Sequence, residues 1–102
     1  MKVKNMTSAK GNKVANQFII TDKRYDEKEN KWYTTETFQS YDSTIAIVFC
    51  TGVVLLDENT WDYSVTTGKY RNDFLGEGIA ETRAKIKSGE YTLTDLNKHG
   101  GV

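Results

Sequence analysis

The stretch of sequence that decides the fold reads Thr44-Ile45-Ala46-Ile47-Val48-Phe49-Cys50-Thr51-Gly52-Val53-Val54-Leu55-Leu56. Two apolar runs, 45–50 and 53–56, are separated by Thr51-Gly52, and a two-residue spacing is compatible with a tight hairpin turn. Because apolar residues follow one another without alternation, both faces of these strands need cover. The stretch therefore predicts two central strands of a sheet that is buried on both sides.

Further strands are expected on either side of this pair. Residues 16–21 and 31–39 are rich in aromatic and β-branched residues, and a polar loop between them predicts a hairpin. Residues 90–96 predict a last strand. Between the central pair and this last strand, two helices are expected at 67–75 and 78–88, ending at the glycines that follow them. We predict an α+β fold, an antiparallel sheet of about five strands with two short helices packed on one face.

The chain of 102 residues has the size of one domain. Residues 1–13 lack hydrophobic periodicity, so we expect a flexible basic leader, with ordered structure starting near Val14. Residues 14–97 are expected to form the single domain, and residues 98–102 a frayed tail. Two helices can cover only one face of the sheet. A symmetric dimer that forms through the other face is therefore one alternative.

No pattern in the sequence points to catalysis, a metal site or a cofactor. Cys50 is the single cysteine and His99 the single histidine, which is too few for a zinc site or a nucleophile–base pair. Gly76-Glu77-Gly78 follows a helical stretch and not a strand, so a phosphate-binding loop is not expected. The longest apolar run, 45–50, is far shorter than the roughly 20 residues of a membrane helix, and no secretory signal is recognised. We expect a non-enzymatic, cytoplasmic protein without cofactors.

Charge is balanced overall but uneven along the chain. The 14 basic and 14 acidic side chains give a net charge of zero. Residues 1–24 carry six Lys or Arg and one Asp (+5), residues 25–63 carry two Lys and eight Asp or Glu (−6), and the rest carries six and five (+1). The basic and acidic segments suggest either mutual attraction or two different partner surfaces.

The candidate site is the segment between Leu56 and Leu75, where aromatic and charged residues are interleaved. Trp, Tyr and Arg dominate interface hot spots, but they are also ordinary core residues, so both interpretations stay open. Eight residues are the candidates for partner binding: Asp57, Glu58, Trp61, Asp62, Tyr63, Lys69, Tyr70 and Arg71.

A nucleic-acid partner is the alternative hypothesis. Aromatic residues with Lys69, Arg71 and the basic leader could stack bases and contact phosphates. The neighbouring carboxylates Asp57, Glu58, Asp62 and Asp73 would repel a phosphate backbone, which favours a protein partner instead.

Three segments, 38–46, 56–64 and 66–76, continued by 86–97, resemble a family of short uncharacterised proteins from phages and mobile elements of Gram-positive bacteria. The resemblance implies no catalytic residues. It implies a setting in which small proteins act by occupying a host protein, for example a CRISPR nuclease. Our leading hypothesis is therefore a protein-binding inhibitor of a host defence complex; the alternatives are a small nucleic-acid-binding regulator and an assembly factor that acts as a homo-oligomer.

Overall fold

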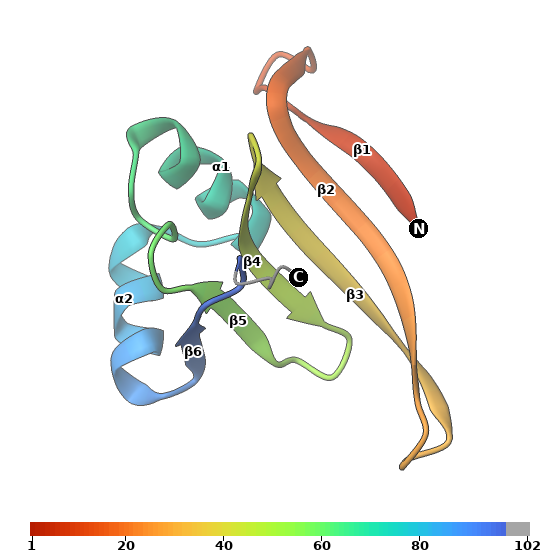
Figure 1. Ribbon diagram of the computed structural model, residues 1–102. Coiled ribbons are helices and arrows are strands. Elements are labelled where there is room, and N and C mark those ends of the chain that lie inside the picture. The colour runs from red at the N-terminus through yellow and green to blue at the C-terminus, as the bar shows by residue number, and fades with distance from the viewer. Residues whose placement is uncertain (98–102) are drawn as a thin grey trace.

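Six strands and two helices make up the fold in the computed structural model, which describes residues 1–97 (Figure 1). The α+β class is confirmed. One sheet has the strand order β1-β2-β3-β4-β5-β6. The elements are β1 Lys2–Thr7, β2 Lys13–Asp26, β3 Lys31–Ser40, β4 Ser43–Phe49, β5 Val54–Asp57, α1 Val65–Leu75, α2 Ile79–Ser88 and β6 Tyr91–Thr94.

The sheet is mixed, so the prediction of a purely antiparallel sheet was wrong at its last strand. Neighbours from β1 to β5 pair antiparallel, whereas β6 pairs with β5 in parallel, Val54 opposite Tyr91. The reason is the connection: α1 and α2 carry the chain back to the start of β5, and a crossover of this length permits parallel pairing. The expectation of about five strands fell one short because β1 was missed.

The N-terminal segment is a strand rather than an unstructured leader. β1 pairs with β2 from Lys2 opposite Thr21 to Thr7 opposite Lys13, so ordered structure does not begin near Val14 as predicted. An edge strand is held by backbone hydrogen bonds and can do with few apolar side chains. Met6 is the one buried residue of β1. Because a single buried residue produces no hydrophobic periodicity, the sequence pattern could not reveal this strand. The tail expected at 98–102, with His99, lies outside the described residues.

A bulge explains part of the unbroken apolar run in β4. The register with β3 shifts between Phe38 and Gln39, so that Phe38 pairs with Ala46 while Gln39 pairs with Thr44. Ile45 is the extra residue, and both Ile45 and Ala46 are fully buried. A bulge interrupts the alternation of side chains between the two faces. The remaining residues of the run, Ile47 to Phe49, are half-buried.

Both helices lie on the same side of the sheet. Phe74 of α1 packs on Phe38 of β3, with ring centroids 5.8 Å apart, and Tyr91 of β6 bonds to Glu77 at the entrance to α2. α1 begins two residues earlier than predicted because Ser64 caps it by accepting from the Thr67 N–H, and it ends at Gly76 as predicted. The buried core under the helices consists of Met6, Phe38, Ile45, Ala46, Val54, Leu56, Tyr70 and Tyr91.

The β2–β3 hairpin extends beyond the rest of the sheet (Figure 1). β1 pairs with β2 only as far as Thr21, and β4 pairs with β3 only from Thr35 onward. Between these points, residues 22–34 form a two-stranded ribbon that we call the hairpin arm. A two-stranded ribbon exposes side chains on both of its faces. The arm therefore presents residues that the core does not need.

Candidate functional site

The eight candidate residues are divided between the interior and the surface. Asp57, Tyr70 and Arg71 are buried, so their side chains cannot form a contact surface in this fold. Trp61 is half-buried. The exposed members are Glu58, Asp62, Tyr63 and Lys69.

Asp57 is a structural carboxylate at the end of β5. Its Oδ2 accepts from the Thr60 hydroxyl (2.7 Å) and from the N–H groups of Thr60 (2.9 Å) and Asn59 (3.2 Å), and its Oδ1 accepts from the Leu96 N–H at 2.8 Å. Burial by itself would raise the pKa of Asp57, but these hydrogen bonds outweigh burial and lower it. All of these donors belong to the chain itself, so Asp57 has a structural and not a partner-binding role.

Arg71 is also internal. Only 1% of it is exposed, and its guanidinium donates to the Trp61 carbonyl (2.6 Å) and to the Asn72 side-chain oxygen (2.9 Å). The guanidinium carbon lies 5.4 Å from the centre of the Trp61 ring. Trp61 and Arg71, the residue types that made this segment resemble an interface hot spot, therefore contact each other inside the fold. Arg71 is unavailable to phosphates in this arrangement.

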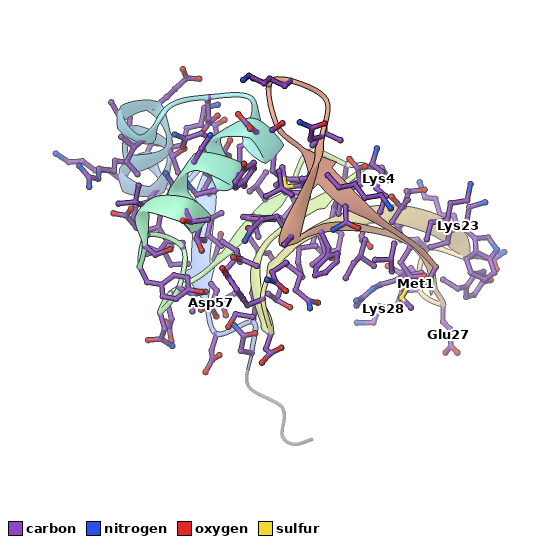
Figure 2. The ribbon with its side chains drawn as sticks, turned by 90° about the horizontal axis from the view of Figure 1, so that it is seen from above. Met1, Lys4, Lys23, Glu27, Lys28 and Asp57 are labelled. Carbon is purple, nitrogen blue, oxygen red and sulfur yellow. The ribbon has the colours of Figure 1, made fainter. Side chains whose placement is uncertain are left out.

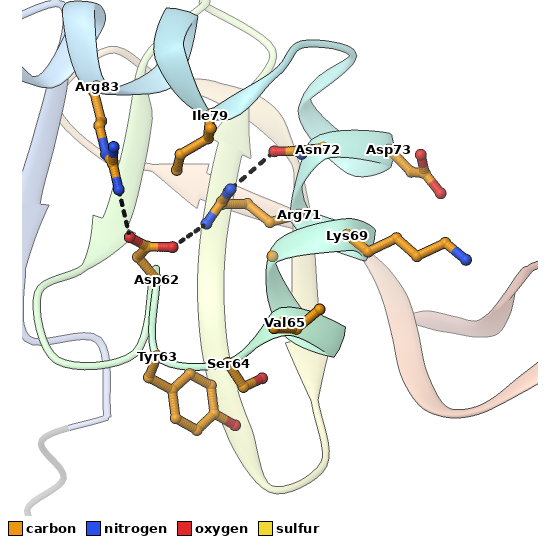
Figure 3. A pocket seen from close by; sticks show the side chains of 11 residues that line it. Asp62, Tyr63, Ser64, Val65, Lys69, Arg71, Asn72, Asp73, Ile79 and Arg83 are labelled. Atoms are coloured by element: carbon orange, nitrogen blue, oxygen red, sulfur yellow. Dashed lines mark hydrogen bonds and ion pairs between the residues drawn. The ribbon is translucent and has the colours of Figure 1, made fainter.

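Three of the exposed candidates, Asp62, Tyr63 and Lys69, line an open groove beside α1, of about 700 Å³, which we call the α1 groove (Figure 3). Glu58 is not part of its lining. Figure 3 shows Asp62 between two arginines: its carboxylate lies 3.4 Å from Arg71 and 3.3 Å from Arg83. The central charges of the groove are thus already paired with one another. Its lining is Asp62, Tyr63, Ser64, Val65, Gly68, Lys69, Arg71, Asn72, Asp73, Ile79 and Arg83.

A second surface lies on the sheet face opposite the helices. Cross-strand partners share a face, and the row formed by Ile19, Phe38, Ala46 and Leu56 faces the helices. The adjacent row therefore points the other way. This row runs across four strands through Ile20, Thr37, Ile47 and Leu55.

The apolar members of this opposite face are Ile20, Tyr33, Ile47, Phe49, Val53 and Leu55, and we call it the helix-free face. Val53 is 51% exposed, and the other apolar members of this face are half-buried. A hollow of about 370 Å³ is lined mainly by Tyr33, Phe49, Val53 and Leu55, with Asp26 at its edge. Burial, and then the charges of Glu29 and Asp26, raise the pKa of Tyr33, so its hydroxyl stays neutral at physiological pH. The hollow is lined largely by uncharged side chains.

A third cluster, at Glu77, has a structural role. Glu77 Oε1 accepts from Lys85 and from the Tyr91 hydroxyl, both at 2.8 Å, and Oε2 accepts from the Thr82 hydroxyl at 2.6 Å. Burial opposes the charge of Glu77, but the three donors together lower its pKa. The cluster fastens α2 to β6. Among residues 1–97, no group of three or more His, Cys, Asp or Glu side chains could hold a metal ion.

The sequence predicted an uncovered sheet face but not its composition. The unbroken apolarity of 45–50 and 53–56 was the signal, and it located Ile47, Phe49 and Leu55 correctly in strands. Tyr33 was missed as a member because only the β3–β4 register brings residues 33–35 beside Phe49. The eight-residue list instead followed aromatic and charged composition, which does not distinguish a buried Trp–Arg pair from an exposed one.

A scan against protein families matches residues 1–91 to a family of unknown function, DUF8033. The chain belongs to this family. The matched region contains every strand and helix from β1 to α2. A search of curated proteins and a search of solved structures each gave no match. Within the described residues, neither helix has the length and apolarity needed to cross a membrane.

Proposed function

We propose that the chain is a small, non-enzymatic protein-binding module whose contact surface is the helix-free face. The observation that supports this is the apolar hollow formed by Tyr33, Phe49, Val53 and Leu55. Covering apolar surface is favourable by roughly 25 cal/mol per Å², and exposed apolar patches often mark interaction sites. The α1 groove is less suited to this role because its arginines are paired with Asp62.

The partner proposed is a host protein in the bacterial cytoplasm. In the setting implied by the resemblance, the chain occupies the surface of a defence complex such as a CRISPR nuclease and inhibits it by steric occupation. Such inhibition needs no catalytic group, cofactor or metal. This form of the proposal rests on the resemblance and not on a residue of the helix-free face.

Two exposed valines make a matched pair for testing the proposal. Val53 borders the hollow on the helix-free face, and Val65, which is 92% exposed, lines the α1 groove. Neither side chain is buried, so Val53→Asp and Val65→Asp should each change the free energy of unfolding by less than about 0.5 kcal/mol. The same charge is then placed on one surface or the other.

The experiment is affinity capture from a Gram-positive host lysate with the wild-type chain and both variants. We expect a protein that is retained by the wild type and by Val65→Asp but lost with Val53→Asp. Loss with Val65→Asp and retention with Val53→Asp would overturn the proposal in favour of the α1 groove. A second copy of the chain is the alternative occupant; sedimentation would then show a dimer that Val53→Asp converts to a monomer.

A further inference from the structure

One surface is used neither by the core nor by the proposed protein contact. It lies on the helix side of the sheet, but on the half of the molecule away from α1 and α2, where Figure 2 shows Lys4 and Lys23. The register places Lys2 opposite Thr21, Lys23 opposite Thr34, and Tyr25 opposite Trp32. Residues two apart on a strand share a face. We define the arm surface as Lys2, Lys4, Lys23, Tyr25 and Trp32.

The aromatic pair of the arm surface is unusually open. Trp32 is 65% exposed and Tyr25 45% exposed, although aromatic side chains are normally buried in a core. Their ring centroids lie 5.3 Å apart with an interplanar angle of 66°, so the two rings contact edge to face. The Tyr25 hydroxyl donates to the side-chain oxygen of Asn30. The two rings thus contact each other while much of their surface lies in water.

Strand alternation sorts the charges of the arm between its two faces. Lys23 falls on the arm surface, whereas its neighbours Asp22 and Arg24 in β2 fall on the opposite face. A hollow of about 450 Å³ beside the aromatic pair is lined by Lys2, Lys23, Thr21 and Thr34, with Met1 and Asp22 at its border. Glu36 shares the strand face, since it pairs with Thr21. Asp22 also borders the hollow, but its carboxylate lies 3.9 Å from the N-terminal amine of Met1. Three lysines against Glu36 therefore leave the surface basic, although residues 25–63 are acidic in sequence.

We propose that the arm surface binds single-stranded nucleic acid, with unpaired bases stacking on Trp32 and Tyr25 and phosphates contacting Lys2, Lys4 and Lys23. Aromatic side chains beside a basic groove are the combination that single-strand binders use. A duplex would keep its bases stacked inside, and an acidic protein, whose carboxylates would pair with the lysines, is the alternative occupant that the test below distinguishes. The nucleic-acid hypothesis based on the sequence used the basic leader with Lys69 and Arg71. The arm surface keeps Lys2 and Lys4 of that leader but not Lys69 or Arg71, of which Arg71 is buried.

The test is fluorescence anisotropy of a labelled 12-nucleotide oligo-dT, titrated with the full chain at several salt concentrations. Three phosphate contacts predict a slope of log K against log salt of about −2. Trp32→Ala should weaken binding by about fivefold or more, and Trp32→Phe should restore most of it because the ring still stacks. Lys23→Gln should make the slope shallower by about 0.7. Circular dichroism melting checks that each variant is folded.

Matched controls lie on other surfaces. Tyr63→Ala removes an exposed aromatic of the α1 groove, and Lys87→Gln removes an exposed lysine of α2. Both should leave oligo-dT binding unchanged. The proposal is overturned if the wild type does not bind, if Trp32→Ala binds as well as the wild type, or if polyglutamate competes as well as oligo-dT. Val53→Asp should bind oligo-dT normally, so this test and the capture experiment fail independently.

Discussion

The carboxylate of Asp57 and the backbone N–H of Leu96 are joined by a hydrogen bond of 2.8 Å across 39 positions of the chain. This bond fastens the segment after β6 to the end of β5. The other oxygen of Asp57 closes the turn through Thr60. A residue that composition marked as a partner contact thus holds together two parallel strands.

Asp57→Asn is therefore expected to destabilise the fold. The amide keeps one oxygen as acceptor, so either the turn or the Leu96 N–H loses its partner, and an unsatisfied buried group costs about 1–3 kcal/mol. Urea unfolding measures the change. The exposed neighbour Glu58 supplies the control, since Glu58→Gln should change the free energy of unfolding by less than about 0.5 kcal/mol. Equal effects of the two substitutions would contradict the structural role of Asp57.

Stability is expected to fall in acid because of Asp57 and Glu77. Hydrogen bonds lower the pKa of both carboxyls in the folded chain, whereas in the unfolded chain they titrate near about 3.9 and 4.3. Their contribution is fully present above these unfolded values and is lost as pH falls through the folded pKa values. Urea unfolding from pH 7 to pH 3 should show the decline, and the double variant Asp57→Asn, Glu77→Gln should show a smaller one. An unchanged pH dependence in the double variant would count against this assignment.

Gly68 within α1 and Gly76, which caps its C-terminal end, are expected to respond to alanine in opposite directions. At Gly68, an added Cβ would lie 3.7 Å from the Arg71 guanidinium, an ordinary contact, so Gly68→Ala should stabilise by up to about 1 kcal/mol through helix propensity. Gly76 has φ +71°, and Gly76→Ala should destabilise by about 1–2 kcal/mol. Thermal melting distinguishes the two. A destabilising Gly68→Ala would mean that Arg71 cannot tolerate the extra methyl group.

Replacing Gln17 with an apolar residue of the same volume is expected to stabilise the fold. The Gln17 side chain is fully buried, and within residues 1–97 neither its amide nitrogen nor its amide oxygen has a hydrogen-bond partner. Burying an amide without a partner costs about 1–3 kcal/mol, so Gln17→Met, which keeps the volume, should raise the free energy of unfolding by about 1 kcal/mol. Gln39→Met should lower it instead, because Gln39 donates to the Tyr41 carbonyl at 2.8 Å. A loss of stability in Gln17→Met would contradict this account of the site.

Much of the fold could be predicted from local patterns. The glycines at 76 and 89 mark both helix ends, since each adopts a left-handed conformation that other residues avoid. The apolar run from Ile45 marks the central strands. The direction of β6 could not be predicted, because parallel pairing depends on how α1 and α2 return the chain and not on residues 91–94 themselves.

The site was harder to predict than the fold. The charge and aromatic content of residues 57–74 is the same whether Arg71 points to solvent or to the Trp61 carbonyl, and packing decides between the two. Lys23 and Lys2 are far apart in sequence, and only the pairing of β1 with β2 places them around one hollow. Surfaces assembled from several strands therefore need the register before they can be recognised.

Methyl NMR with the captured partner tests most directly whether the helix-free face is the contact surface. The methyl groups of Ile47, Val53 and Leu55 report on that face, and those of Val65 and Ile79 report on the α1 groove. On addition of the unlabelled partner, we predict that the first set shifts or broadens while the second set does not. Changes confined to Val65 and Ile79 would contradict the proposal.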